Sequence, residues 1–128
     1  MLNVLPQVTG IFVSRHLKIS YSAAVELASL AFWNGLRLRL EVSTKPKEVG
    51  TRSVVLRLGG LSIRLERLHT HLDLWISRDG RCIEIGRDLT DMREVLKKVR
   101  TTAENYQRTQ RPWWAVVPTD RYQFIKFL

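Results

Sequence analysis

The chain has 128 residues, of which 45% are hydrophobic and one is cysteine. This length fits one domain and suffices to bury a core without disulfides or metals, and the hydrophobic content argues against wholesale disorder. The net charge of +9, from 21 Lys and Arg against 12 Asp and Glu, favours polyanionic partners, nucleic acid before an anionic membrane surface.

The sequence also indicates a compartment. A single cysteine, Cys82, cannot form an intramolecular disulfide, which favours a reducing environment. Residues 1–6 lack the pattern of a signal peptide, and no apolar run reaches the roughly 18 residues of a spanning helix. We therefore expect a cytoplasmic protein that does not bind membranes. Arginines interleaved with acids also suit the ion-pair networks of proteins from hot environments, so a thermophilic source is a further hypothesis.

Two elements are expected at the start of the chain. Residues 8–14 predict a strand. Residues 21–33 predict a helix, capped by Ser20 or Ser22 and ended by Asn34 and Gly35, which tolerate a left-handed backbone. This helix is apolar almost all round, so it is expected to be buried under a sheet or in a subunit interface.

A meander of antiparallel strands is expected between Leu36 and Gly86. Gly59-Gly60 and Asp79-Gly80 supply two-residue hairpin turns, and alternating aliphatic residues fix which face of each strand is buried. The cross-strand pairs that follow are Val55 with Arg64, Ser53 with Glu66, Trp75 with Glu84, and Ser77 with Cys82. The expected core-facing residues are Leu36, Leu38, Leu40, Val42, Val54, Leu56, Leu58, Leu61, Ile63, Leu65, Leu72, Leu74, Ile76, Ile83 and Ile85.

A second helix is expected over residues 89–107, starting at Asp88 or Thr90. Its apolar stripe consists of Leu89, Met92, Leu96, Val99, Ala103 and Tyr106. Residues 45–50 predict a polar loop, and residues 113–117 and 122–128 predict a C-terminal hairpin. The expected fold class is α+β: an antiparallel meander of about five strands plus a C-terminal hairpin, packed with two helices.

The leading functional hypothesis is non-catalytic binding of nucleic acid, RNA or single strands before duplex DNA. An arginine-rich sheet with an exposed aromatic side chain can hold phosphates and stack bases, unless a helix or the C-terminal hairpin covers that aromatic. The candidate residues on the sheet are Arg37, Arg39, Arg57, Arg64 and Trp75. A second basic patch is expected at Lys97, Lys98, Arg100, Arg108 and Arg111.

Two alternatives stay open. The first is a protein-interaction module or accessory subunit, because the chain has more large apolar surface than two helices and one sheet face need. It would self-associate or dock a partner through helix 21–33 or the hydrophobic C-terminus. Its candidate interface residues are Trp33, Trp113, Trp114, Phe124 and Phe127. The second is a metal-dependent enzyme at His69, His71 and Asp73, which a strand would place on one face.

No catalytic motif supports an enzyme. The sequence contains no GxSxG, CxxC or glycine-rich phosphate loop. Cys82 has no expected base beside it and is interpreted as structural. We therefore expect a protein without catalytic residues or a cofactor.

Overall fold

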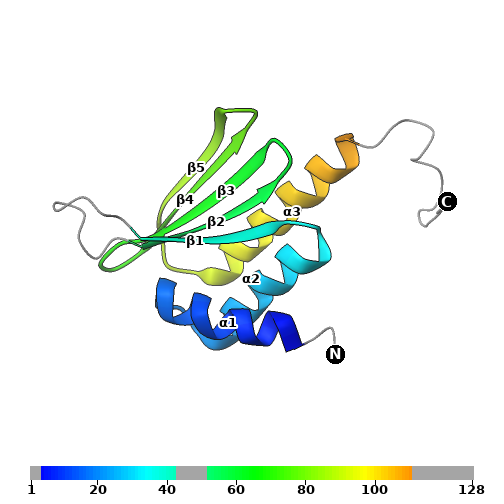
Figure 1. Cartoon of the computed structure of the whole chain (residues 1–128). Helices are drawn as coiled ribbons and strands as arrows, with labels where there is room; N and C mark the ends of the chain where they lie inside the picture. Colours follow the sequence, from blue (N-terminus) through cyan, green and yellow to red (C-terminus); the bar gives the residue numbers. More distant parts are fainter. Residues whose placement is uncertain (1–3, 43–51, 111–128) are drawn as a thin grey trace.

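A five-stranded antiparallel sheet and three helices make up the described part of the chain (Figure 1). The computed structural model describes residues 4–42 and 52–110. The elements are α1 (Val4–Leu17), α2 (Tyr21–Trp33), β1 (Arg37–Val42), β2 (Arg52–Leu58), β3 (Leu61–Arg67), β4 (Leu72–Arg78), β5 (Arg81–Leu89) and α3 (Met92–Gln110). The strands are adjacent in sequence order, so the α+β class and the meander are confirmed. The expected loop at 45–50 and the C-terminal hairpin lie outside the described residues.

The helices cover one face of the sheet (Figure 1). The aliphatic residues on this face form one core with Leu27 of α2 and with Val95 and Val99 of α3. The fully buried strand residues in that core are Val54, Leu56, Leu61, Ile63, Leu65, Leu74 and Ile76. The opposite face, which we call the open face, is not covered by any described helix.

Helix α1 replaces the strand expected over residues 8–14, so that prediction was wrong. Local β propensity at Ile11, Phe12 and Val13 is overridden because the segment packs along α2. Gly10 permits this close approach, since a Cβ atom there would lie 2.7 Å from Cγ2 of Val25. Val13 and Leu17 are fully buried on the same side of α1.

Helix α2 has the expected bounds. Ser20 is its N-cap, and its hydroxyl accepts a hydrogen bond from the backbone N–H of Ala23 at 3.2 Å. Asn34 and Gly35 end the helix as expected, with Gly35 at a φ of 71°.

Both expected hairpin turns are present. Leu58 pairs with Leu61 across Gly59-Gly60, and Arg78 pairs with Arg81 across Asp79-Gly80. Asp79 and Gly80 have φ values of 52° and 84°, the paired positive angles that a tight two-residue turn requires.

Strand β5 departs from the expected register at a β-bulge. Ile76 pairs with Glu84 and Ser77 with Cys82, which leaves Ile83 as the extra residue. Trp75 is therefore opposite Ile85, and the expected pairing with Glu84 was wrong. Ile83 and Ile85, expected in the core, are 56% and 50% exposed.

The edge strand β1 also carries apolar residues outside the core. Leu40 and Val42 are 44% and 56% exposed, and Leu38 is half-buried. The alternation of aliphatic residues along β1 predicted correctly which side chains share the helix-bearing face of the sheet. The helices do not extend over the whole of this edge strand, so the last of these side chains stay exposed. The prediction that Leu40 and Val42 belong to the core was therefore wrong.

Helix α3 begins later than expected. Strand β5 continues to Leu89, which pairs with Leu72. Asp91 then caps the helix, since its carboxylate accepts the backbone N–H of Arg93 at 3.0 Å. Four residues of the expected apolar stripe are buried: Leu96, Val99, Ala103 and Tyr106. The other two, Leu89 and Met92, are half-buried, and Val95, which was not in the expected stripe, is buried as well.

Candidate nucleic-acid interface

The open face is organised in three rows that run across the strands. Residues directly opposite one another in an antiparallel sheet point to the same face, so the strand register defines each row. Row one contains Arg37, Arg57, Ser62, Ser77 and Cys82. Row two contains Arg39, Val55, Arg64, Trp75 and Ile85. Row three contains Glu41, Ser53, Glu66 and Asp73.

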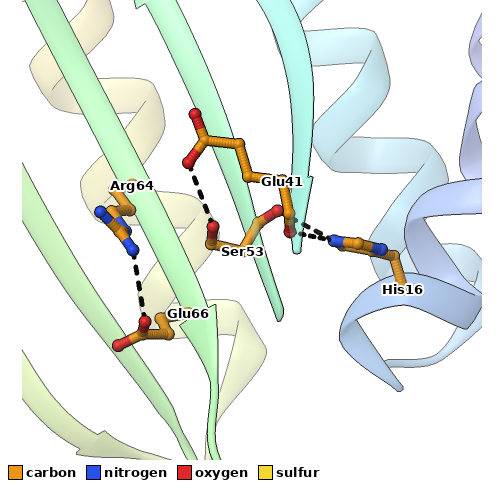
Figure 2. Close-up of polar contacts among 5 residues, drawn as sticks. All are labelled: His16, Glu41, Ser53, Arg64 and Glu66. Atoms are coloured by element: carbon orange, nitrogen blue, oxygen red, sulfur yellow. Dashed lines mark hydrogen bonds and ion pairs between the residues drawn. The ribbon is translucent and has the colours of Figure 1, made fainter. Parts of the chain in front are cut away.

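The arginines of row two are paired with the acids of row three. Nε of Arg39 lies 3.2 Å from Oε2 of Glu41, two positions along the same strand. Nη2 of Arg64 lies 3.3 Å from Oε2 of Glu66, with the same spacing (Figure 2). The carboxylates therefore neutralise much of the positive charge in the middle of the face.

The arginines of row one are different. Arg37 is the direct cross-strand partner of Arg57, and both side chains are exposed. Neither guanidinium forms an ion pair or hydrogen bond with another residue in the described part of the chain. The excess positive charge of the open face is thus concentrated at this pair.

Trp75 lies in the middle of the open face, half-buried, with no described helix over it. Cζ of Arg64 is 6.0 Å from the centre of its ring, at the limit of a cation–π contact. Trp75, Arg57 and Ser62 are among the residues that line a hollow of about 470 Å³ on this face. An aromatic ring in a shallow hollow that also contains arginine side chains provides a surface on which a base can stack.

His16 of α1 contacts the backbone of β1 and β2 at row three of the sheet. Its Nε2 lies 2.7 Å from the backbone oxygen of Glu41 and 3.0 Å from that of Ser53 (Figure 2). Both partners are carbonyl oxygens, so Nε2 carries the hydrogen and donates. The buried hydroxyl of Ser53 donates in turn to Oε1 of Glu41 at 3.4 Å. Sequence reasoning missed this histidine because it expected a strand over residues 8–14 and no helix that continues to residue 17.

The second expected basic patch, on α3, is largely engaged in contacts. Nζ of Lys98 lies 2.6 Å from Oε2 of Glu84, and Nη2 of Arg100 lies 2.8 Å from Oε2 of Glu26. The hydrogen bond to Glu84, and then its charge, raise the pKa of Lys98. Nη2 of Arg108 donates to the side-chain oxygen of Asn105. Of the other two patch residues, Lys97 is exposed and Arg111 lies outside the described residues.

The candidate metal ligands are only partly brought together. Nε2 of His71 lies 3.4 Å from Oδ1 of Asp73, at the start of β4. His69 lies in the preceding bend and is exposed. Among the described residues, no group of three His, Cys, Asp or Glu side chains is placed to hold a metal ion. Cys82 is exposed, and its thiol contacts the backbone oxygen of Glu84 at 3.7 Å.

Exposed apolar side chains lie at the two ends of α2 and along α1. Most apolar residues of α2 are buried, and the exposed ones, Tyr21, Phe32 and Trp33, lie at its two ends. Trp33 is 62% exposed and makes an edge contact with Phe32 at 5.0 Å between ring centres. Helix α1 adds exposed apolar residues at Leu5, Val8, Ile11 and Phe12. Trp113, Trp114, Phe124 and Phe127 lie outside the described residues.

These features define an α+β protein whose antiparallel sheet leaves one arginine-bearing face uncovered by the described helices. No protein-family model, curated protein or solved structure matches the chain. In the described residues, no helix is both long and apolar enough to cross a membrane.

Proposed function

We propose that the protein binds single-stranded nucleic acid, without catalysis, on the open face of its sheet. The observation that carries this proposal is that Trp75 and four arginines share one sheet face that no described helix covers. Guanidinium groups bind phosphates through charge-assisted hydrogen bonds, and an aromatic ring stacks on a base whatever its identity.

Single strands fit this surface better than a duplex. A duplex reader inserts a helix or a two-stranded ribbon into the major groove, and the described part of the open face carries neither. Trp75 lies within the sheet surface, so it meets a base only where that base is unpaired and turned toward the protein.

Fluorescence anisotropy tests the proposal. Labelled single-stranded RNA, single-stranded DNA and duplex DNA of equal length are titrated with protein across a salt series. The expected result is micromolar or tighter binding of single strands near physiological salt, with weaker binding of the duplex. Equal, weak binding of all three probes that disappears above low salt would show only generic charge attraction and would overturn the proposal.

A second candidate function, self-association or docking of a protein partner, is supported by the exposed apolar residues of α1 and by Trp33. Contiguous apolar surface of this kind is typical of protein interfaces. Size-exclusion chromatography with light scattering tests self-association. A dimer that the Phe12→Ser substitution dissociates would support it, whereas a strict monomer at tens of micromolar would exclude it.

A further inference from the structure

Row one of the open face concentrates positive charge in a way that the fold itself does not require. Arg37 and Arg57 are neighbours across the β1–β2 pair, where Cα atoms lie about 4.5–5.5 Å apart. Like charges directly opposite one another destabilise a sheet. In the described residues, no carboxylate is paired with either arginine, although row three supplies carboxylates to both arginines of row two.

The same row continues with two hydroxyl groups. Ser62 on β3 is the direct partner of Ser77 on β4, and both side chains are half-exposed. Neither hydroxyl makes a side-chain hydrogen bond within the described part of the protein. Row one therefore presents two guanidinium groups, on β1 and β2, and two available hydroxyl donors, on β3 and β4.

We propose that row one is a phosphate track: Arg37, Arg57, Ser62 and Ser77 bind consecutive phosphates of a single strand that crosses β1 to β4. The proposal rests on the nucleic-acid function above and adds the direction of the ligand. Bases extend from the track toward row two, where Trp75 and Ile85 provide the stacking surface. Row three forms the boundary, because its glutamates hold Arg39 and Arg64 in ion pairs and so offer a phosphate no free positive charge.

This arrangement separates the four arginines by role. Arg37 and Arg57 contact the ligand, whereas Arg39 and Arg64 remain with Glu41 and Glu66. A surface that attracts nucleic acid only through net charge would use all four equally. The two double variants R37Q/R57Q and R39Q/R64Q are therefore a matched pair, since each removes two arginines and lowers the net charge by the same amount.

The experiment measures anisotropy with fluorescein-labelled 15-nucleotide oligo(U) and with an abasic strand of equal phosphate count, across a salt series. R37Q/R57Q is expected to bind oligo(U) about tenfold more weakly or worse, with the salt slope reduced by about 1.4, as expected for two lost contacts to a single strand. R39Q/R64Q is expected to change affinity by less than about threefold and the slope by less than about 0.5. Thermal melts establish that both variants are folded.

The remaining outcomes separate this proposal from the function on which it rests. Binding of oligo(U) that both variants weaken equally, or that R39Q/R64Q weakens more, would overturn the phosphate track and leave nucleic-acid binding in place. If R37Q/R57Q alone weakens binding but the protein binds the abasic strand as tightly as oligo(U), the phosphate track is supported and the stacking role of Trp75 in the proposed function is overturned. Absence of binding to both probes at low salt would overturn both proposals.

Discussion

Arg37 on β1 and Arg57 on β2 are direct cross-strand partners on the open face, and no described carboxylate lies between them. Two like charges in this position lower the free energy of unfolding, by about as much as a favourable cross-strand pair raises it. Sites that bind ligands often retain features that cost stability. The repulsion between Arg37 and Arg57 can therefore be measured as a change in stability without any ligand.

Arg37→Gln is expected to raise the free energy of unfolding by about 0.2–1 kcal/mol, because it removes the repulsion with Arg57 while retaining a polar, unbranched side chain. Urea denaturation measures the change. Arg39→Gln is the matched control on the same strand and is expected to be neutral or destabilising, since it removes the pair with Glu41. A lower stability of Arg37→Gln than of wild type would mean that the two guanidinium groups do not repel in the folded state.

Trp75→Ala is expected to weaken binding of oligo(U) by about 1–3 kcal/mol, the usual contribution of one base stacked on an aromatic ring. Trp75→Phe retains a ring and is expected to lose less. The control is Trp33→Ala, which removes an exposed tryptophan from the end of α2 that belongs to none of the three rows. An affinity for oligo(U) unchanged by Trp75→Ala would exclude this ring as the stacking surface.

Gly10→Ala is expected to destabilise the protein by about 1 kcal/mol, although alanine favours helices. Overpacking costs roughly 1–3 kcal/mol, and the better helix propensity of alanine returns up to about 1 kcal/mol. The added Cβ atom would lie 2.7 Å from Cγ2 of Val25. Val25→Ala removes that atom, so a double-mutant cycle followed by urea denaturation is expected to show a favourable coupling. Strict additivity would mean that α1 does not approach α2 so closely at this point.

Tyr106→Phe is expected to lower the free energy of unfolding by about 1 kcal/mol. The phenol oxygen of Tyr106 accepts the backbone N–H of Gly60 at 2.9 Å and so ties the β2–β3 turn to α3. Its ring also lies 5.0 Å from the guanidinium carbon of Arg78, and that contact remains in the variant. Hydrogen exchange provides the specific readout, because the Gly60 amide loses protection while the amides of β2 keep theirs. Unchanged exchange at Gly60 would contradict the assignment.

The Lys98–Glu84 pair predicts a pH dependence at the alkaline end. Glu84 raises the pKa of Lys98 above its ordinary value of 10.5, so the folded state holds this proton more tightly than the unfolded state. The stabilisation is complete below pH 10.5 and is lost as the pH rises through the raised value. The difference in free energy of unfolding between wild type and Lys98→Gln is thus expected to be constant from neutral pH up to pH 10.5 and to shrink at higher pH. A difference that grows with alkaline pH would have the wrong sign.

The sequence by itself determined the centre of the sheet and helix α2. The two-residue turn at Gly59-Gly60 sets the pairing of β2 with β3, and the turn at Asp79-Gly80 sets the pairing of β4 with β5 as far as the bulge at Ile83, both through local backbone geometry. The alternation of aliphatic residues then placed Arg57, Arg64 and Trp75 on the same face. Ser20 marked the start of α2 because its side chain caps a backbone N–H only three residues away.

Only the tertiary structure decided the remaining features, because each depends on contacts between distant segments. Residues 8–14 have the composition of a strand, and they become helical because Gly10 allows α1 to pack against Val25. The bulge at Ile83 shifts Glu84 toward Lys98 and brings Ile85 beside Trp75. Nine residues separate Val42 of β1 from Arg52 of β2 in the sequence, so the sequence left the register of these two strands open. The pairing of Arg37 with Arg57 is set instead by the assembled sheet.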